Sequence, residues 1–256
     1  MNNHSLLQPG ERIDDLQFAN LKVIQSPDAF RFGMDAVLLA DFANARPGNR
    51  CCDLGTGTGI LPLLLYGREP SVIFDAVEIQ PSAADRAVRS VRLNGLEGRI
   101  CVHQGDIREI RALLPHGAYD LVVCNPPYSP EASSLPSPKD GIRHARQEGA
   151  CTLSDVAAAG KWLLRHHGRL CLMLPAQRLP EAFDTLRQHK LEPKRLRLSH
   201  ARADRPARLC FIEAMLYARP GLAVEPPLIT HENDGRESRE LRRIYHLPEE
   251  TEVSAE

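Results

Sequence analysis

The stretch Asp53-Leu54-Gly55-Thr56-Gly57-Thr58-Gly59 has glycine at every second position and continues the short apolar run Cys51 to Leu54. The apolar residues from Ile60 to Leu65 follow it and predict a helix. Glycine between a buried strand and a helix lets the backbone approach a ligand closely. The dinucleotide fingerprint would place its third glycine one residue later, at Ile60. The turn therefore predicts a bound cofactor and weakens an NAD-dependent dehydrogenase interpretation without eliminating it.

Beyond this turn, short apolar runs alternate with amphipathic stretches, which is typical of strand–helix–strand units in a parallel sheet. The last two runs are joined by a short turn-rich link, so we expect them to pair antiparallel as a hairpin. The fold class that follows is α/β, with a seven-stranded, mostly parallel sheet and an antiparallel last strand. The expected strands are Cys51–Leu54, Val72–Ile79, Ile100–His103, Tyr119–Cys124, Arg169–Leu174, Arg195–Leu198 and Leu209–Leu216.

Three further helices are expected between these strands. One runs from Pro81 to about Leu93, and another covers Leu179 to His189. Thr152 and Asp155 have capping-box spacing, and the helical period of the apolar residues after them continues to Gly168. We therefore expect the middle helix to end at Gly168.

The 256-residue chain is long enough for one large core. We expect residues 1–49 to form an entry segment packed on this core, residues 50–218 to form the main domain, and residues 219–256 to form a charged tail. The tail contains one helix-like piece, from Glu237 to Tyr245. Residues 135–148 form a long loop after the fourth strand, and such loops in compact domains are usually functional lids or disordered.

The formal net charge of −1 argues against a protein that coats nucleic acid by global attraction. A local basic segment remains, since the stretch from Lys190 to Arg208 has seven basic residues and two acidic ones. A solvated face is the alternative interpretation of this segment.

The seven cysteines lie mostly in apolar runs, so we expect buried free thiols rather than disulfides. They show no zinc-binding spacing, and we expect no metal. No apolar stretch reaches the roughly 18 residues that a membrane helix needs, and the N-terminus lacks a signal pattern. These features predict a cytoplasmic protein without a membrane partner.

Asn125-Pro126-Pro127-Tyr128 directly follows the apolar run Asp120 to Cys124. Proline lacks an N–H and restricts the residue before it, so the backbone is stiff here. A stiff backbone can hold the Asn125 side-chain oxygen and the Pro126 carbonyl as two convergent acceptors for one planar amino group. Tyr128 is placed to stack on the ring that carries this group.

Two acidic residues come at or just after the ends of expected strands. Glu78 lies 23 residues after Gly55, where an acid can accept hydrogen bonds from ribose hydroxyls. Asp106 follows the next strand and could accept from an adenine amino group. For either acid alone a helix cap would be the preferred interpretation, but together with the glycine turn the two acids favour a cofactor site.

These motifs resemble those of class I S-adenosylmethionine-dependent methyltransferases, with a Rossmann-like fold, over roughly Arg50 to Leu216. The resemblance makes Asp53 to Gly59 the cofactor loop and Asn125 to Tyr128 the catalytic motif. It implies methylation of an amino group: adenine N6, cytosine N4, guanine N2 or glutamine N5. The implied catalytic residues are Asn125, Pro126, Pro127 and Tyr128, and the implied contacts to S-adenosyl-L-methionine are Asp53, Gly55, Thr56, Gly57, Gly59, Glu78, Ile79, Asp106, Ile107 and Asn125.

A second resemblance narrows the substrate. The segment from Phe30 to Ala40 is similar to the entry segment of bacterial tRNA1(Val) adenine-37 N6-methyltransferases, and residues 143–146, 174–179 and 192–197 also resemble that family. Glutamine N5-methyltransferases of release factors usually have a helical N-terminal domain, for which the 49 residues before Arg50 leave little room. Residues 130–139 are rich in proline and serine and depart from the family pattern.

The resemblance implies N6-adenine methylation of transfer RNA, and it leaves four alternatives open: a protein glutamine N5-methyltransferase, another RNA or DNA amino-group methyltransferase, a non-catalytic RNA-binding module, and the dehydrogenase. Phe32 could stack the target base, or it could belong to the core. Arginines in the long loop and in the basic segment are candidate phosphate contacts. The candidate substrate-binding residues are Phe32, Arg143, Arg146, Arg195 and Arg197.

Overall fold

The computed structural model describes residues 6–26, 33–126 and 151–247. Its strands are β1 (Arg12–Asp15), β2 (Lys22–Gln25), β3 (Arg50–Leu54), β4 (Ile73–Glu78), β5 (Ile100–Gln104), β6 (Tyr119–Cys124), β7 (Leu164–Pro175), β8 (Leu191–His200), β9 (Ala207–Leu216), β10 (Ala223–Val224) and β11 (Leu228–Ile229). The helices are α1 (Met34–Ala43), α2 (Ile60–Arg68), α3 (Pro81–Leu93), α4 (Ile110–Leu113), α6 (Leu153–Leu163), α7 (Leu179–Gln188) and α8 (Arg239–Ile244), with short 3-10 helices at Ile107–Glu109 and Ala176–Arg178.

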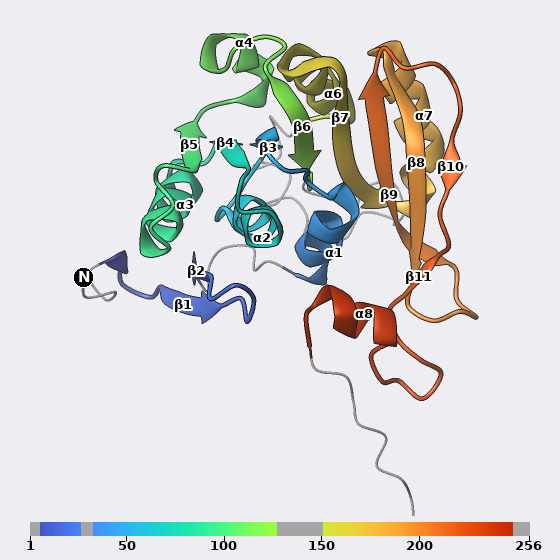
Figure 1. Cartoon of the computed structure of the whole chain (residues 1–256), viewed down its shortest axis with the longest axis horizontal. Helices are drawn as coiled ribbons and strands as arrows, with labels where there is room; N and C mark the ends of the chain where they lie inside the picture. The colour runs from blue at the N-terminus through green and yellow to red at the C-terminus, as the bar shows by residue number, and fades with distance from the viewer. Residues whose placement is uncertain (1–5, 27–32, 127–150, 248–256) are drawn as a thin grey trace, which may run out of the picture.

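The main sheet has the strand order β10-β8-β9-β7-β6-β3-β4-β5, and β11 also pairs with β8 (Figure 1). All seven expected strands are present in it. The expected number of strands was too low, because β10 and β11 add two residues each beside β8. Two-residue strands are too short to give an alternating pattern in the sequence.

The strands from β5 to β7 are parallel, while β9 runs antiparallel to both of its neighbours, β7 and β8. The expected hairpin of the last two long strands is therefore confirmed. Because β3, β4, β5 and β6 run in one direction, their carboxyl ends meet at one edge of the sheet. The candidate site residues lie at this edge, at or just after the strand ends: the glycine turn, Glu78, Asp106 and Asn125.

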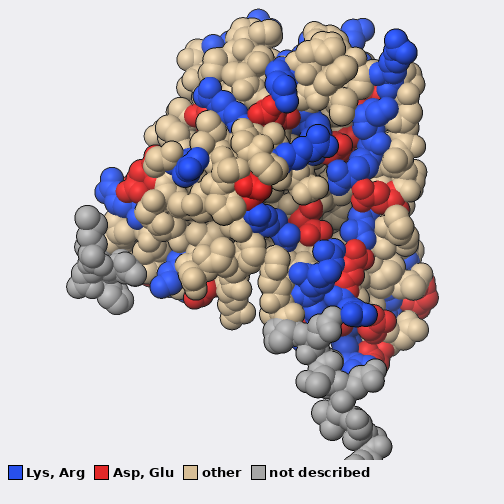
Figure 2. All heavy atoms as spheres, in the orientation of Figure 1, with Lys and Arg blue, Asp and Glu red and all other residues tan. Residues whose placement is uncertain are grey.

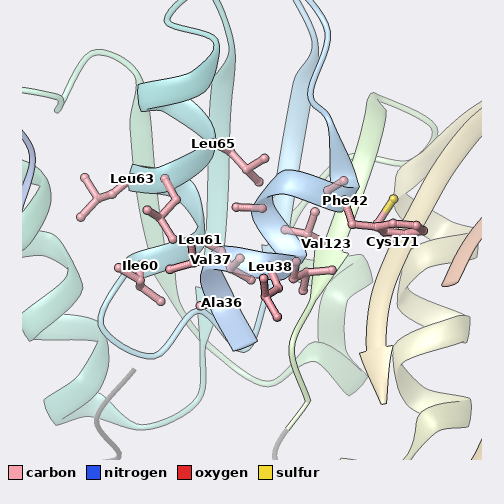
Figure 3. Close-up of a cluster of buried hydrophobic side chains, with 14 of the residues drawn as sticks. Ala36, Val37, Leu38, Phe42, Ile60, Leu61, Leu63, Leu65, Val123 and Cys171 are labelled. Atoms are coloured by element: carbon pink, nitrogen blue, oxygen red, sulfur yellow. The ribbon is translucent and has the colours of Figure 1, made fainter. Parts of the chain in front are cut away.

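Helices cover both faces of the sheet. Successive residues of a strand point to opposite faces, and accordingly Val123 belongs to the core around α1, α2 and α3, whereas Val122 belongs to the core around α4, α6 and α7. Figure 3 shows α1 and α2 side by side on the first face, with Leu61 of α2 near Val37 of α1, and with Phe42 of α1 beside Cys171. This arrangement makes α1 and α2 one continuous apolar layer.

The helix that begins at Thr152 ends earlier than expected. Thr152 and Asp155 form the predicted capping box, but α6 ends at Leu163 and β7 begins at Leu164, so the expectation of a helix to Gly168 was wrong. Leu164 already pairs with Tyr119 of β6, and the register then shifts before Leu121 pairs with Arg169. Leu163 and Leu164 are both buried, so an apolar period alone could not distinguish the two elements.

The N-terminal hairpin of β1 and β2 packs against α3, as Figure 1 shows at one end of the molecule. Glu11 pairs with Arg86 at 3.1 Å and with Arg89 at 2.5 Å, and its side chain is only 4% exposed. The hydrogen bond from Arg89 lowers the pKa of Glu11 to about 2. The Asn94 side chain also bonds the backbone of Lys22 in both directions, so the hairpin is fixed along the whole helix.

The C-terminal segment from β10 to α8 joins the edge of the sheet and the core beside α1. Leu228, Leu241 and Ile244 are at most 2% exposed and belong to the core that contains α1. Arg68 of α2 donates to the Ile244 carbonyl at 2.9 Å. The described part of the tail is therefore part of the packed structure, and the expected helix-like piece corresponds to α8.

The cysteines agree with the expectation of free thiols, since none forms a disulfide. Cys101 is exposed and Cys151 is half-buried; the five buried ones are Cys51, Cys52, Cys124, Cys171 and Cys210. Across the described ranges, no helix has the length and apolar character to cross a bilayer.

Candidate cofactor and catalytic site

The glycine turn has the backbone conformation that its sequence requires. Gly55, Gly57 and Gly59 have φ values of 77°, 58° and 84°, in the left-handed region that other residues rarely adopt. A side-chain carbon at Gly55 or Gly57 would meet no atom within 4 Å, whereas at Gly59 it would lie 3.4 Å from the Ala87 side chain. The turn therefore faces open space at its first two glycines and packs against α3 at the third.

A cavity of about 380 Å³ lies along this turn. Its size falls within the range of roughly 300 to 1,000 Å³ typical of small-molecule sites. It combines a glycine-rich backbone, one acid, the amide of Asn125 and several small side chains. The lining residues are Ser26, Gly33, Ala36, Gly55, Thr56, Gly57, Thr58, Ile60, Leu61, Glu78, Gln80, Ser82, Ala83, Arg86 and Asn125.

Glu78 lines the cavity at the end of β4 and is 6% exposed. Its carboxylate accepts the Gly57 N–H at 2.8 Å and the Gln80 N–H at 2.8 Å, each on a different oxygen. A carboxylate has about four lone-pair sites, so each oxygen can accept one further hydrogen bond. This geometry fits a pair of neighbouring hydroxyl groups such as those of a ribose.

Asp53 lies directly beneath the turn and is fully buried. Among the described residues, no hydrogen bond of normal geometry is made by either carboxyl oxygen of Asp53 or by the Thr56 hydroxyl. Burial raises the pKa of Asp53 to about 7, the nearby Thr56 hydroxyl opposes this rise, and the Glu78 carboxylate adds to it. Buried polar atoms normally have partners, so these atoms fit a ligand that brings hydrogen-bond donors.

Asp106 lies at the same edge of the sheet, next to Glu78, because the Gly105 N–H donates to the Glu78 carbonyl at 2.9 Å. Its carboxylate caps the 3-10 helix through the Arg108 N–H at 2.9 Å and pairs with the Arg108 guanidinium at 2.5 Å. The capping role considered for this acid is therefore present in the structure. Ile79 is 52% exposed beside it, and Ile107 is half-buried.

Asn125 follows β6 and lines the cavity together with the glycine turn and Glu78. The structure thus brings the first residue of the motif that the resemblance implies to be catalytic to the expected cofactor site, although 70 residues separate it from Gly55. Pro126 is half-buried next to it. Five other candidates lie outside the described residues: Pro127, Tyr128, Phe32, Arg143 and Arg146.

Arg195 and Arg197, both candidates for contact with RNA, have partners within the protein. Arg195 pairs with Glu213 at 2.9 Å and with Glu225 at 2.5 Å, and Arg197 pairs with Glu240 at 2.6 Å. Figure 2 shows the same mixture of blue and red side chains on the face around β8 and β10. Contact between these arginines and phosphate would have to compete with the acids beside them.

Several cavity residues were not among the candidates from the sequence. Ser26 and Gly33 come from the N-terminal segment, and Ser82, Ala83 and Arg86 come from the first turns of α3. The serines and alanine are common residues without a motif. The only sequence feature that links Arg86 to the cavity is its position eight residues after Glu78, and this spacing alone does not identify a cavity residue.

Within the part of the chain that the structure describes, one group of metal-binding residue types occurs outside the cavity lining. Asp75, Cys101 and His103 offer ligand atoms within 4.8 Å of one another. Asp75 already accepts the Arg50 guanidinium at 2.9 Å and the Tyr119 hydroxyl at 2.8 Å. The positive charge of Arg50 disfavours a metal ion at this carboxylate.

Comparison with known proteins agrees with this geometry. The family model for the methyltransferase small domain matches residues 15–176. A tRNA1(Val) (adenine(37)-N6)-methyltransferase of Porphyromonas gingivalis is 33% identical over 174 residues, which are 66% of this chain and 68% of the relative. A protein of the same name from Parabacteroides distasonis is 31% identical over 181 residues, 70% of this chain and 74% of the relative.

Among solved structures, a predicted O-methyltransferase from Agrobacterium tumefaciens has a TM-score of 0.67 and 22% identity, and covers 83% of this chain and 95% of its own. At this identity the similarity concerns the fold, which is that of the class I methyltransferases. The family match covers more than half of the chain and includes the glycine turn, Glu78 and Asn125. The chain therefore belongs to the methyltransferase small-domain family.

Proposed function

We propose that this protein transfers a methyl group from S-adenosylmethionine to the N6 amino group of an adenine in transfer RNA, of the tRNA1(Val) adenine-37 type. The observation that carries this proposal is the meeting of Asn125, Glu78 and the glycine turn in one cavity. The names of the relatives from P. gingivalis and P. distasonis support the choice of adenine and of RNA.

S-adenosylmethionine supplies an electrophilic methyl group on a positively charged sulfur. In the proposed arrangement, Glu78 accepts hydrogen bonds from the two ribose hydroxyls. Ile79, exposed directly after β4, would pack on the adenine ring of the cofactor, and Asp106 and Ile107 would border that ring on the β5 side. The open space at Gly55 and Gly57 accommodates the amino-acid part of the cofactor.

Asn125 and Pro126 act on the target amino group. The lone pair of an adenine N6 nitrogen is delocalised into the ring, so this nitrogen is a poor nucleophile. Acceptance of its two N–H bonds by the Asn125 side-chain oxygen and the Pro126 carbonyl directs the lone pair at the methyl carbon. The new C–N bond would form as the C–S bond breaks, the electron pair of that bond would stay on the sulfur of S-adenosylhomocysteine, and the cationic nitrogen would then lose a proton to water. Pro127 and Tyr128 are proposed to stiffen this motif and to stack the base.

Replacement of Glu78 tests the cofactor site. We expect Glu78→Ala to weaken the binding of S-adenosylhomocysteine roughly 10- to 100-fold, because two hydrogen bonds to a charged acceptor are lost. Isothermal titration calorimetry measures this change. Glu78→Gln is the matched control and should lose less affinity, since it keeps one acceptor oxygen. Unchanged affinity in Glu78→Ala would contradict the ribose role.

Replacement of Asn125 separates catalysis from binding. Asn125→Ala should reduce methyl transfer at saturating cofactor by roughly 100-fold or more, as when a preorganised hydrogen-bonding group is removed from other active sites. The affinity for S-adenosylhomocysteine should change only a few fold. Loss of cofactor binding with unchanged turnover at saturation would overturn the assignment, and Asn125→Asp, which keeps an acceptor oxygen, is the control.

The substrate can be identified with labelled cofactor. Incubation with total tRNA and, separately, with release factors should put label only into the RNA, as N6-methyladenosine in a nuclease digest. An unmodified tRNA1(Val) transcript should accept one methyl group, and a transcript with guanine in place of adenine 37 should accept none. Label in the protein fraction alone would support glutamine N5-methylation instead.

A further inference from the structure

The N-terminal hairpin reaches the glycine turn through the side chain of Gln25. This residue is the last of β2 and is 1% exposed. Its Nε2 donates to the Thr58 hydroxyl at 3.3 Å, and Thr58 lines the cavity, as does Ser26, the residue after Gln25. Gln25 therefore lies directly behind the cavity wall although it is far from the turn in sequence.

The oxygen of the same side chain has no partner. Gln25 Oε1 is buried without a hydrogen bond in the described structure, as are both carboxyl oxygens of Asp53 and the hydroxyl of Thr56. The Gln25 and Asp53 oxygens are acceptors only. A buried acceptor left unpaired costs about 1 to 3 kcal/mol. Three acceptor-only oxygens thus lie on residues within or against one seven-residue stretch, and the Thr56 hydroxyl beside Asp53 has a single O–H and can donate to only one of them.

Only one part of the cofactor can supply donors to the other oxygens. Under the proposed function, its ribose hydroxyls are at Glu78, and its adenine amino group is at the edge between β4 and β5. The remaining donor is the α-amino group of its amino-acid end, which is an ammonium ion with three N–H bonds. An ammonium ion suits acceptors that include a carboxylate.

We propose that Gln25 is a cofactor-binding residue whose side-chain oxygen, together with Asp53 and Thr56, accepts hydrogen bonds from the α-amino group of S-adenosylmethionine. This inference rests on the proposed use of that cofactor and adds a residue from outside the glycine turn. It also gives the N-terminal hairpin a function, since Gln25 joins the cofactor end to β2 and hence to α3.

The test compares two ligands that differ only in this group: S-adenosylhomocysteine and its desamino analogue, which lacks the α-amino group. Gln25→Met removes the oxygen at nearly the same length and should weaken S-adenosylhomocysteine roughly 10- to 100-fold, as expected for a lost hydrogen bond to a charged donor. The desamino analogue should keep its wild-type affinity for the variant within about threefold. Gln25→Glu, which keeps an acceptor, should bind S-adenosylhomocysteine within about threefold of the wild type.

Thermal melting of the free protein gives a readout independent of binding. Gln25→Met should melt at or above the wild-type temperature, because it replaces an unpaired buried oxygen, and Gln25→Leu serves as a second apolar variant. Equal weakening of both ligands would overturn the proposal and leave Gln25 with a purely structural role at Thr58. If the wild type binds neither ligand, the proposed cofactor is wrong; if it binds both equally well, only this inference fails.

The pH dependence of binding provides a second measurement. The pKa of Asp53, raised to about 7 by burial, should fall when an ammonium ion pairs with the carboxylate. The groups that face Asp53 are Glu78 and the thiols of Cys52 and Cys124. Burial raises the pKa of each thiol, so both thiols stay neutral. Below about pH 7 a proton must leave Asp53 on binding, so the Kd of S-adenosylhomocysteine should rise as the pH falls, by up to about tenfold per unit. Parallel profiles for the desamino analogue, which shares every contact to Glu78, would contradict the proposal.

Discussion

The left-handed backbone at Gly55, Gly57 and Gly59 is the constraint on which the site depends. Each of these conformations would cost another residue roughly 1 to 2 kcal/mol. The turn they allow takes the chain from the end of β3 into α2 within five residues and points the Gly57 N–H at Glu78 on the neighbouring strand. The glycines thereby fix the carboxylate and leave open the space beside it, so that one local feature creates both the cavity and its main polar group.

The opposite wall of the cavity depends on a buried ionic group far from it. Glu213 of β9 lies between Arg169 of β7 and Arg195 of β8, at 2.8 and 2.9 Å. Arg169 donates to the carbonyls of Ala43 and Asn44, and Arg195 donates to that of Phe42, so the two arginines satisfy the last carbonyls of α1. Breaking such a buried pair typically costs about 3 to 5 kcal/mol. Because Gly33 and Ala36 at the other end of α1 line the cavity, the antiparallel strand helps to position the site.

The sequence predicted those features that depend on neighbours along the chain or on the common direction of parallel strands. The helix from Pro81 to Leu93 begins with a proline at its first position and was predicted with its observed bounds, as was β6. The family resemblance implied Glu78 and Asn125 as contacts to one cofactor, and the two residues line one cavity because both come at the carboxyl ends of parallel strands. Contacts between distant segments could not be predicted in this way. The partners of Arg195, for example, lie 18 and 30 residues away and give no periodic signal, so a buried ion pair looked like a basic surface.

The unpaired polar atoms beneath the turn connect stability with binding. In the protein without a ligand, substitution of Gln25 or Asp53 by an apolar residue would remove buried acceptors that lack partners. Such a substitution would stabilise the folded state. The same acceptors become favourable when a ligand brings donors to them, because the cost of burial has already been met in the folded protein. Preorganised acceptors of this kind add more to affinity than groups that must first lose water. Under the proposed function, the glycine turn therefore contributes to binding in two distinct ways: its open backbone admits the cofactor, and the buried acceptors behind it pair with the donors that the cofactor brings.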